Sequence, residues 1–254
     1  MSRFKVGIQL QPQHTTMADL RSAWRAADAM GADSIWTWDH FYPLYGDPDG
    51  AHFEGWVTLA AMAADTAHAQ VGMLVTGNTY RNPELLADMA RTLDHVSDGR
   101  ACLGLGAGWF ERDYDEYGYE FGTAGSRLRA LEAALVRIRT RIDALNPAPI
   151  GALPIMIGGG GEKVTLRITA QHADQWNTFG PPENFAHKNA VLDRWCAEVG
   201  RDPASIERTV GINAGELDAV EAYLEAGAQH LILMTGTEGA FDLSALERLL
   251  AIRD

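Results

Sequence analysis

Two neighbouring residues, Asp39 and His40, directly follow a short apolar segment and carry side chains that can move protons. An imidazole donates or accepts a proton near neutral pH. Hydride transfer to or from a carbonyl group or an activated alkene requires such a proton partner. The pair is therefore a candidate catalytic site. The alternative is a loop histidine that only satisfies structural hydrogen bonds.

Four consecutive glycines, Gly158, Gly159, Gly160 and Gly161, stand between an expected strand and an expected helix. Glycine lets the backbone approach a ligand closely and adopt unusual dihedral angles. The free N–H groups at the start of the following helix then face an anion such as a phosphate. We therefore expect phosphate binding at this tetraglycine segment, and a flexible connection without a ligand is the alternative.

A second glycine-rich segment, 104–109 (GLGAGW), invites comparison with the dinucleotide-binding fingerprint. That fingerprint requires glycine or alanine at its sixth position, where Trp109 stands, and it normally lies early in the fold. The segment therefore does not predict a Rossmann domain.

Eight short apolar segments alternate with helical patterns along the chain. Leu128, Leu131, Leu135 and Ile138 recur at spacings of three and four, which is typical of one helix face, and Ser126 is the expected cap of that helix. The expected strands cover residues 4–10, 33–37, 70–75, 100–105, 154–157, 174–178, 206–212 and 229–234. This alternation predicts a (β/α)8 TIM barrel in a single domain, 1–254, and a doubly wound open sheet is the competing topology.

In such a barrel, the loops that follow the strands lie together at the C-terminal face and carry the chemistry. The longest is an aromatic-rich insertion, 38–53, after the second strand, and it contains Asp39 and His40. The other loops cover residues 11–15, 76–82, 106–119, 158–162, 177–182, 213–215 and 235–239. The proton-carrying pair and both glycine-rich segments are thus expected at one end of the barrel.

Several of these segments, taken together and in order, resemble the luciferase-like family, in particular its branch that uses the deazaflavin coenzyme F420. The matching segments are 38–41 (WDHF), 75–83 (VTGNTYRNP), 104–109 (GLGAGW), 154–162 (PIMIGGGGE) and 173–177 (ADQWN). The resemblance covers about residues 4 to 200. Each motif is weak alone, and the chain is shorter than many relatives.

The resemblance implies coenzyme F420 as the cofactor, with FMN as the alternative. It implies that Asp39 and His40 lie beside the ring and that a non-prolyl cis peptide bond lies behind it, at Met73-Leu74. Thr76 is a candidate hydrogen-bond partner for the edge of the ring. The alternative is a threonine at the end of a strand that makes no contact with the ring. The cofactor-binding residues that it implies are Asp39, Met73, Leu74, Thr76, Gly106, Ala107, Gly108, Gly158, Gly159, Gly160 and Gly161.

Trp109 and Trp176 are expected to wall an apolar substrate pocket above the ring. In sugar-phosphate dehydrogenases of the deazaflavin branch, a glutamate occupies the position of Trp109, so the resemblance argues against that substrate class. Other loop aromatics are left open, because aromatic side chains in loops often pack against one another. Four basic residues are candidates for holding the coenzyme's anionic tail, or are plain surface charges: Arg81, Arg112, Lys163 and Arg167.

Composition excludes several other classes. The net charge of −13 argues against a nucleic-acid-binding protein. The chain has no apolar stretch long enough to span a membrane, and its two cysteines, Cys102 and Cys196, form no CxxC pair and are typical of a reduced, cytoplasmic protein. No metal-ligand spacing occurs among the eight histidines. We expect a homodimer through outer helices, since relatives are usually dimers.

Three functional hypotheses follow. The first is an F420-dependent oxidoreductase that transfers a hydride between the deazaflavin and a small organic substrate, with His40 and Asp39 as catalytic residues. The second is an FMN-dependent luciferase-like monooxygenase, in which the pocket shields a reactive flavin from water. The third is a non-catalytic cofactor-binding protein on the same barrel.

Overall fold

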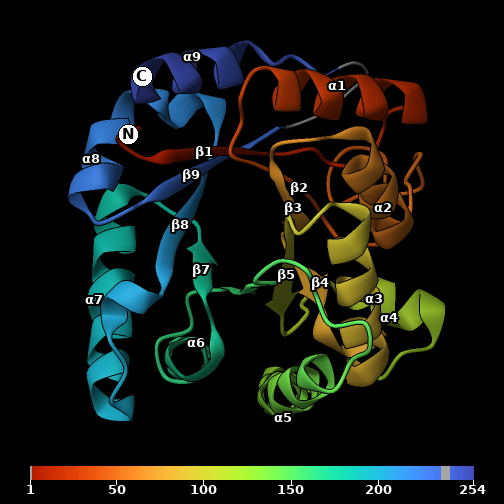
Figure 1. Cartoon of the computed structure of the whole chain (residues 1–254), viewed down its shortest axis with the longest axis vertical. Coiled ribbons are helices and arrows are strands. Elements are labelled where there is room, and N and C mark those ends of the chain that lie inside the picture. Colours follow the sequence, from red (N-terminus) through yellow and green to blue (C-terminus); the bar gives the residue numbers. More distant parts are fainter. Residues whose placement is uncertain (1, 236–240) are drawn as a thin grey trace.

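The strands form a closed parallel barrel in a computed structural model that describes residues 2–235 and 241–254 (Figure 1). Strand order is β3-β2-β1-β9-β8-β7-β6-β5-β4, and an additional pairing of β3 with β5 closes the ring. The strands are β1 (Lys5–Gln9), β2 (Ser34–Thr37), β3 (Gln70–Met73), β4 (Thr76–Gly77), β5 (Ala101–Gly106), β6 (Ile155–Gly158), β7 (Gln175–Thr178), β8 (Glu207–Ile212) and β9 (His230–Met234). The expected TIM barrel is confirmed, and the open doubly wound sheet is excluded.

The first and last strands pair over their whole length, from Lys5 with His230 to Gln9 with Met234. Because every pairing between strands is parallel, the carboxyl ends of all strands meet at one end of the barrel. Of the loops expected at that end, the segment 235–239 lies outside the described residues except for Thr235.

The third strand of the barrel is interrupted: β3 covers the first four residues of the expected strand, 70–75, and β4 lies just beyond its expected end. The non-prolyl cis peptide bond lies at Leu74-Val75, one residue later than the sequence-based expectation of Met73-Leu74. Here the Leu74 carbonyl accepts a hydrogen bond from the Gln9 side chain (2.8 Å) inside the barrel. The ladder to β2 therefore ends at Met73, and the interruption begins at the next residue.

Helices surround the barrel (Figure 1). They are α1 (Met17–Ala29), α2 (Gly55–Asp65), α3 (Pro83–Val96), α4 (Glu111–Tyr117), α5 (Ala124–Asp143), α6 (Thr165–His172), α7 (Pro182–Val199), α8 (Val220–Glu225) and α9 (Ser244–Arg253), with short 3-10 helices η1 (Asn78–Tyr80), η2 (Pro203–Ser205) and η3 (Ala214–Ala219). Of the described residues, no helix is both long and apolar enough to cross a membrane.

Two helix starts differ from the sequence-based expectation. The cap of α5 is Thr123, whose side chain accepts from the Ser126 amide, and Ser126 returns a bond to Thr123 in a capping box. Ser126 therefore lies inside the helix rather than at its cap. Helix α4 was not expected at all, because its seven residues, five charged and two tyrosine, show no clear apolar face.

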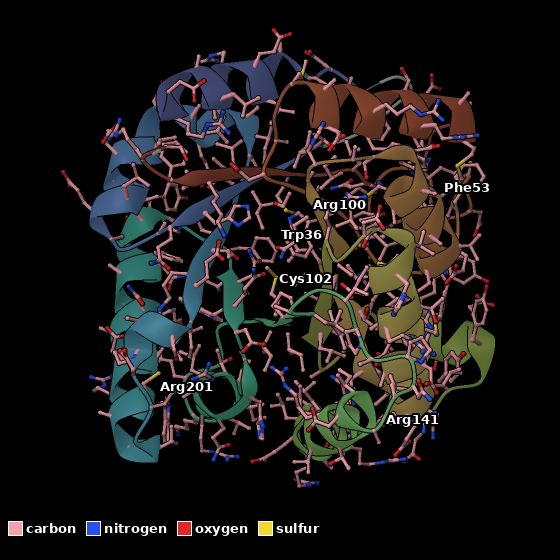
Figure 2. All side chains as sticks on the ribbon, in the orientation of Figure 1. Trp36, Phe53, Arg100, Cys102, Arg141 and Arg201 are labelled. Carbon is pink, nitrogen blue, oxygen red and sulfur yellow. The ribbon has the colours of Figure 1, made fainter. Side chains whose placement is uncertain are left out.

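The barrel interior holds a small apolar layer. Trp36, Leu74, Cys102, Met156 and Ile232 form a buried cluster of their own. Figure 2 shows Trp36 and Cys102 near the centre of the barrel. The larger core lies between the strands and the helices and includes side chains from nearly every element.

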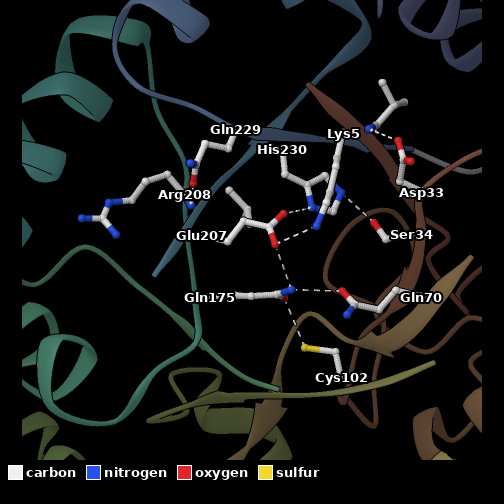
Figure 3. A network of polar contacts seen from close by, with 12 residues as sticks. Lys5, Asp33, Ser34, Gln70, Cys102, Gln175, Glu207, Arg208, Gln229 and His230 are labelled. Carbon is white, nitrogen blue, oxygen red and sulfur yellow. Dashed lines mark hydrogen bonds and ion pairs between the residues drawn. The ribbon is translucent and has the colours of Figure 1, made fainter. Parts of the chain in front are cut away.

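A polar network occupies the opposite end of the barrel from the loops that follow the strands (Figure 3). His230 contacts Ser34 Oγ through Nε2 (2.8 Å) and Glu207 Oε1 through Nδ1 (3.1 Å). The order matches the hydrogen bonds of a hydrolase triad. However, Ser34 is fully buried and its oxygen also accepts from Trp36 Nε1 (2.6 Å), so we assign the network a structural role.

Candidate active site

A cavity of about 370 Å³ opens at the carboxyl ends of the strands. Apart from Thr165, the first residue of α6, its wall comes from strand ends and the loops after them, as is typical of a TIM barrel. Its lining residues are Gln9, Trp38, Asp39, His40, Leu44, Tyr45, Leu74, Val75, Thr76, Gly77, Tyr80, Gly106, Ala107, Gly108, Trp109, Gly158, Gly159, Thr165, Asn177, Phe179 and Met234.

Asp39 is buried and is held by Arg81, whose two terminal nitrogens donate to its two carboxylate oxygens at 2.6 and 2.9 Å. The Gly77 amide donates a further bond of 3.1 Å. Burial raises the pKa of Asp39 to about 6, against the opposing effect of the Arg81 charge. Arg81 is therefore committed to the loop carrying Asp39 and to Glu54, which accepts at 3.1 Å.

His40 is paired with a different carboxylate, Asp113 of α4. The ring atom Nδ1 lies 2.7 Å from Asp113 Oδ2, and Asp113 is fully buried. The same carboxylate accepts from the Phe41 amide (3.0 Å) and from the Tyr80 hydroxyl (3.1 Å). Because Nδ1 is engaged by Asp113, the opposite nitrogen, Nε2, is the one left for a ligand in the cavity.

Three lining residues carry buried oxygens without a hydrogen-bond partner in the described structure: Gln9 Oε1, Thr76 Oγ1 and Asn177 Oδ1. The amide nitrogens of Gln9 and Asn177 are fixed by Leu74 O and Thr209 Oγ1, both at 2.8 Å. Buried polar atoms normally have partners, and leaving one unpaired costs about 1–3 kcal/mol. The amide oxygens of Gln9 and Asn177 can accept from N–H groups, and the Thr76 hydroxyl can accept from N–H or donate to C=O, a set that fits the polar edge of a planar heterocycle.

The turn after β5 brings Gly106, Ala107 and Gly108 to the cavity wall, as the resemblance implies. Gly108 has φ +82°, and a Cβ there would collide with the Tyr114 hydroxyl of α4. Its carbonyl accepts from Arg127 Nε at 3.0 Å. The glycine therefore lets α4, and with it Asp113, pack closely under the cavity wall.

The tetraglycine segment is divided between the cavity and its surroundings. Gly158 and Gly159 line the cavity, whereas Gly160 and Gly161 are not among the described lining residues. Gly159 has φ +131°, and its amide donates to Asn177 O (2.9 Å) rather than pointing freely at a ligand. Helix α6 begins only at Thr165, so a turn separates it from the glycines.

A cation lies beside the tetraglycine segment. A Cβ at Gly160 would lie 3.7 Å from Lys188 Cε of α7. Lys188 Nζ bonds Glu162 Oε1 at 2.5 Å, and His187 bonds the same oxygen at 3.0 Å. Glycine backbone with an adjacent lysine is a combination that suits a phosphate.

Of the two tryptophans expected to wall the pocket, the structure places only one in the cavity lining. Trp109 lines the cavity, but Trp176 is fully buried outside the described lining, stacks on Phe185 of α7 and donates from Nε1 to Gly159 O (2.9 Å). Successive strand residues point to opposite faces. Asn177 of β7 points into the barrel, so its neighbour Trp176 points out toward the helices. Met73 also lies outside the described lining.

The basic residues considered for an anionic tail have other partners, apart from Lys163. Arg112 pairs with Asp49 (2.5 Å) and lies over the Tyr42 ring, and Arg167 pairs with Glu132 (2.6 Å). Lys163 is exposed beside Glu162. Lys188 was missed, because a lysine in the middle of a helical pattern gives no sequence signal.

Asp113, Tyr80, Gln9 and Asn177 were also missed as site residues. Asp113 and Asn177 lie within loops expected at the C-terminal face, and that position was the available signal. Within the described residues, no cluster of three His, Cys, Asp or Glu side chains could hold a metal ion, and both cysteines are buried thiols.

Comparison with known proteins identifies the family. Residues 1–240 match the family described as luciferase-like monooxygenase. The chain is 30% identical over 246 residues to phthiodiolone/phenolphthiodiolone dimycocerosates ketoreductase of Mycobacterium tuberculosis, an alignment that covers 81% of this chain and 64% of that protein. The chain therefore belongs to the luciferase-like monooxygenase family.

Solved structures share the fold. An F420-dependent secondary alcohol dehydrogenase, in complex with an F420-acetone adduct, superposes with a TM-score of 0.87 at 17% identity, covering 99% of this chain and 98% of that one. The coenzyme F420-dependent tetrahydromethanopterin reductase of Methanopyrus kandleri gives 0.80 at 15% identity, covering 99% and 100%. The family assignment makes the protein a luciferase-like oxidoreductase, and the solved structures that share its fold include F420-dependent enzymes.

Proposed function

We propose that the protein is an F420-dependent oxidoreductase that interconverts an alcohol and a carbonyl compound. The observation that carries the proposal is His40, paired with the buried Asp113, at the wall of a cavity whose lining includes three residues with buried, unpaired oxygens. The two F420-dependent enzymes that share the fold over nearly the whole chain support the choice of cofactor. When bound, the deazaflavin accepts or returns the hydride of a two-electron step.

The residues present fit a ring cofactor with a phosphate. Gln9, Thr76 and Asn177 would meet the polar edge of the ring, and Gly106, Ala107 and Gly108 would lie along its side. Gly158 to Gly161 with Lys188 would take the phosphate. Asp39 would hold the loop that carries His40 in place through Arg81, rather than exchange protons with substrate, because both its oxygens are engaged.

His40 would move the proton. With Nδ1–H donated to the Asp113 carboxylate, neutral His40 presents the Nε2 lone pair to a substrate hydroxyl. It takes that proton as the alcohol is oxidised, and Asp113 stabilises the resulting imidazolium. In the reverse direction, the imidazolium donates to the carbonyl oxygen and returns to the neutral form.

Titration of the purified protein with F420 and with FMN tests the cofactor assignment. We expect saturable F420 binding, followed by absorbance and tryptophan fluorescence, and reduction of the bound coenzyme on adding secondary alcohols. Tight FMN binding without F420 binding would instead support a flavin monooxygenase. Tight F420 binding without turnover for any alcohol or ketone would favour a non-catalytic cofactor protein.

We also propose a homodimer formed through outer helices. Exposed apolar side chains on α2 and α3, Val57 and Leu85, make these helices candidates for the interface. Sedimentation at working concentration measures the mass directly, and a monomer would contradict this expectation.

A further inference from the structure

Three aromatic side chains line the cavity and also face solvent. Tyr45, Trp109 and Phe179 are 62, 64 and 51% exposed, although each contributes to the cavity wall. They come from the loops after β2, β5 and β7 and are named here the aromatic rim. Large apolar side chains exposed together at the mouth of a pocket mark a binding surface rather than ordinary surface composition.

The side chains of the aromatic rim pack against neighbouring residues. Trp109 meets the edges of His40 and Phe110, with ring centroids 5.7 and 5.5 Å away. Phe179 lies over Gly211, where a Cβ would collide with its ring, and beside Met234 Sδ. These side chains are therefore positioned in advance of a ligand, which limits the ordering entropy that binding would cost.

Tyr45 is positioned through Trp38. The two ring centroids are 6.4 Å apart, and Trp38 stacks on His52 and donates to its Nε2 at 3.0 Å. Burial lowers the pKa of His52 to about 4, so His52 is neutral at pH 7 and remains an acceptor for Trp38. His52 therefore adds no charge behind Trp38 and Tyr45, which line the cavity.

Charge restricts the ligand further. Of the described residues that line the cavity, none is lysine or arginine, and the negative charge of Asp39 is paired with Arg81. Lys188 lies at the tetraglycine segment, where the cofactor phosphate would be held, and so is not free for a substrate. The substrate end of the site accordingly suits a neutral molecule.

The volume of the cavity limits which part of that molecule can enter it. Ligand cavities span about 300–1,000 Å³, so 370 Å³ is near the lower limit. A tricyclic cofactor ring would occupy part of this volume, so the space left beside His40 suits a small functional group. The rest of a longer substrate would have to leave the cavity across its mouth.

We propose that the substrate is a neutral alcohol or ketone with an extended apolar chain, and that this chain lies on the aromatic rim formed by Tyr45, Trp109 and Phe179. The inference rests on the proposed function for the placement of the oxygen at His40. The rim is then a subsite that selects chain length, separate from the groups that hold the cofactor.

Calorimetric titration of the cofactor-loaded protein with a series of 2-alkanones, from 2-butanone to 2-nonanone, tests the subsite without requiring turnover. We expect affinity to rise about two- to four-fold for each added methylene, as burial of a CH₂ group implies. Trp109→Ala should flatten this dependence. Val136→Ala, at an exposed position of α5 outside the described lining, is the matched control and should leave it unchanged.

A second series, of keto acids with a terminal carboxylate, distinguishes apolar from anionic recognition and should bind more weakly than ketones of equal length. Affinity independent of chain length in the wild type, or stronger binding of the keto acids, would overturn the inference even if F420 binds. Failure of F420 to bind in the earlier titration would overturn the proposed function, and the alkanone series repeated without cofactor would still report on the rim.

Discussion

The imidazole Nδ1 of His40, a residue of the cavity wall, lies 2.7 Å from the buried carboxylate of Asp113, 73 positions away in the chain. One residue follows β2 and the other belongs to α4, a seven-residue helix after β5. The Phe41 amide and the Tyr80 hydroxyl also donate to Asp113, so a single buried carboxylate fixes the ring and the backbone beside it. Asp113 is therefore a positioning residue for His40.

Asp113→Asn should lower kcat by about 10- to 100-fold, a part of the contribution of a positioned proton-transfer group. The amide cannot stabilise an imidazolium, so the pH profile of kcat should also shift. Steady-state kinetics across pH measures both effects. Asp115→Asn, at an exposed position of the same helix, is the control, and equal losses in the two variants would mean that α4 has only a structural role.

His40→Ala should lower kcat by about 10²- to 10⁴-fold while F420 still binds. His40→Gln serves as the second variant, because glutamine can donate to Asp113 but cannot take a proton from substrate. Stopped-flow reduction of bound coenzyme by a secondary alcohol isolates the chemical step. Activity that survives both substitutions would remove His40 from the mechanism.

Arg81→Met should destabilise the protein by about 3–5 kcal/mol, because it leaves the buried carboxylate of Asp39 without its cation. Denaturant unfolding at pH 7 measures the loss. Arg137→Met breaks an exposed pair with Glu84 and should cost less than about 1 kcal/mol. If the two variants lose the same stability, the Asp39–Arg81 pair does not hold the loop after β2.

Sequence reasoning reached the fold because each strand and helix repeats a local pattern and eight such units close a barrel. The loops that line the cavity could also be predicted, because in a TIM barrel they are the loops that follow the carboxyl ends of the strands. His40 and Gly159 lie there for that reason. The roles of these residues stay predictions until they are tested.

The remaining details depend on single-residue geometry that composition does not contain. Trp176 and Asn177 are neighbours, and a shift of one residue decides which of them enters the barrel. The cis peptide bond differs from expectation by the same one-residue step. The pairing of His40 with Asp113 requires that α4 packs against the loop after β2. The short and polar sequence of α4 gave no helical signal.

Gly159→Ala should weaken F420 binding and destabilise the fold by about 1–3 kcal/mol, because φ +131° is costly for a residue with a Cβ. The Gly159 backbone also joins β6 to β7 through Asn177 O and Trp176 Nε1. Gly215→Ala is the control, since a Cβ there meets nothing within 4 Å. Calorimetric F420 titration and thermal unfolding report the two effects separately. Unchanged cofactor affinity would place the phosphate elsewhere.

Glu207→Gln should reduce stability at neutral pH but not in acid. Burial by itself would raise the pKa of Glu207, but bonds from His230 and Lys5 outweigh it and lower the value to about 2. A carboxyl whose pKa is lower in the folded than in the unfolded state stabilises above its unfolded pKa of 4.5, and that contribution is lost as pH falls toward 2.

We expect a loss on the order of 2 kcal/mol at pH 7 in Glu207→Gln, a value reduced for the partial exposure of the carboxylate. The difference in unfolding free energy from wild type should shrink steadily between pH 4.5 and pH 2. Urea unfolding of both proteins across this range measures it. Because Glu207 lies at the opposite end of the barrel from the cavity, F420 affinity should not change, and a difference in stability that stays constant with pH would show that the loss comes from packing rather than from charge.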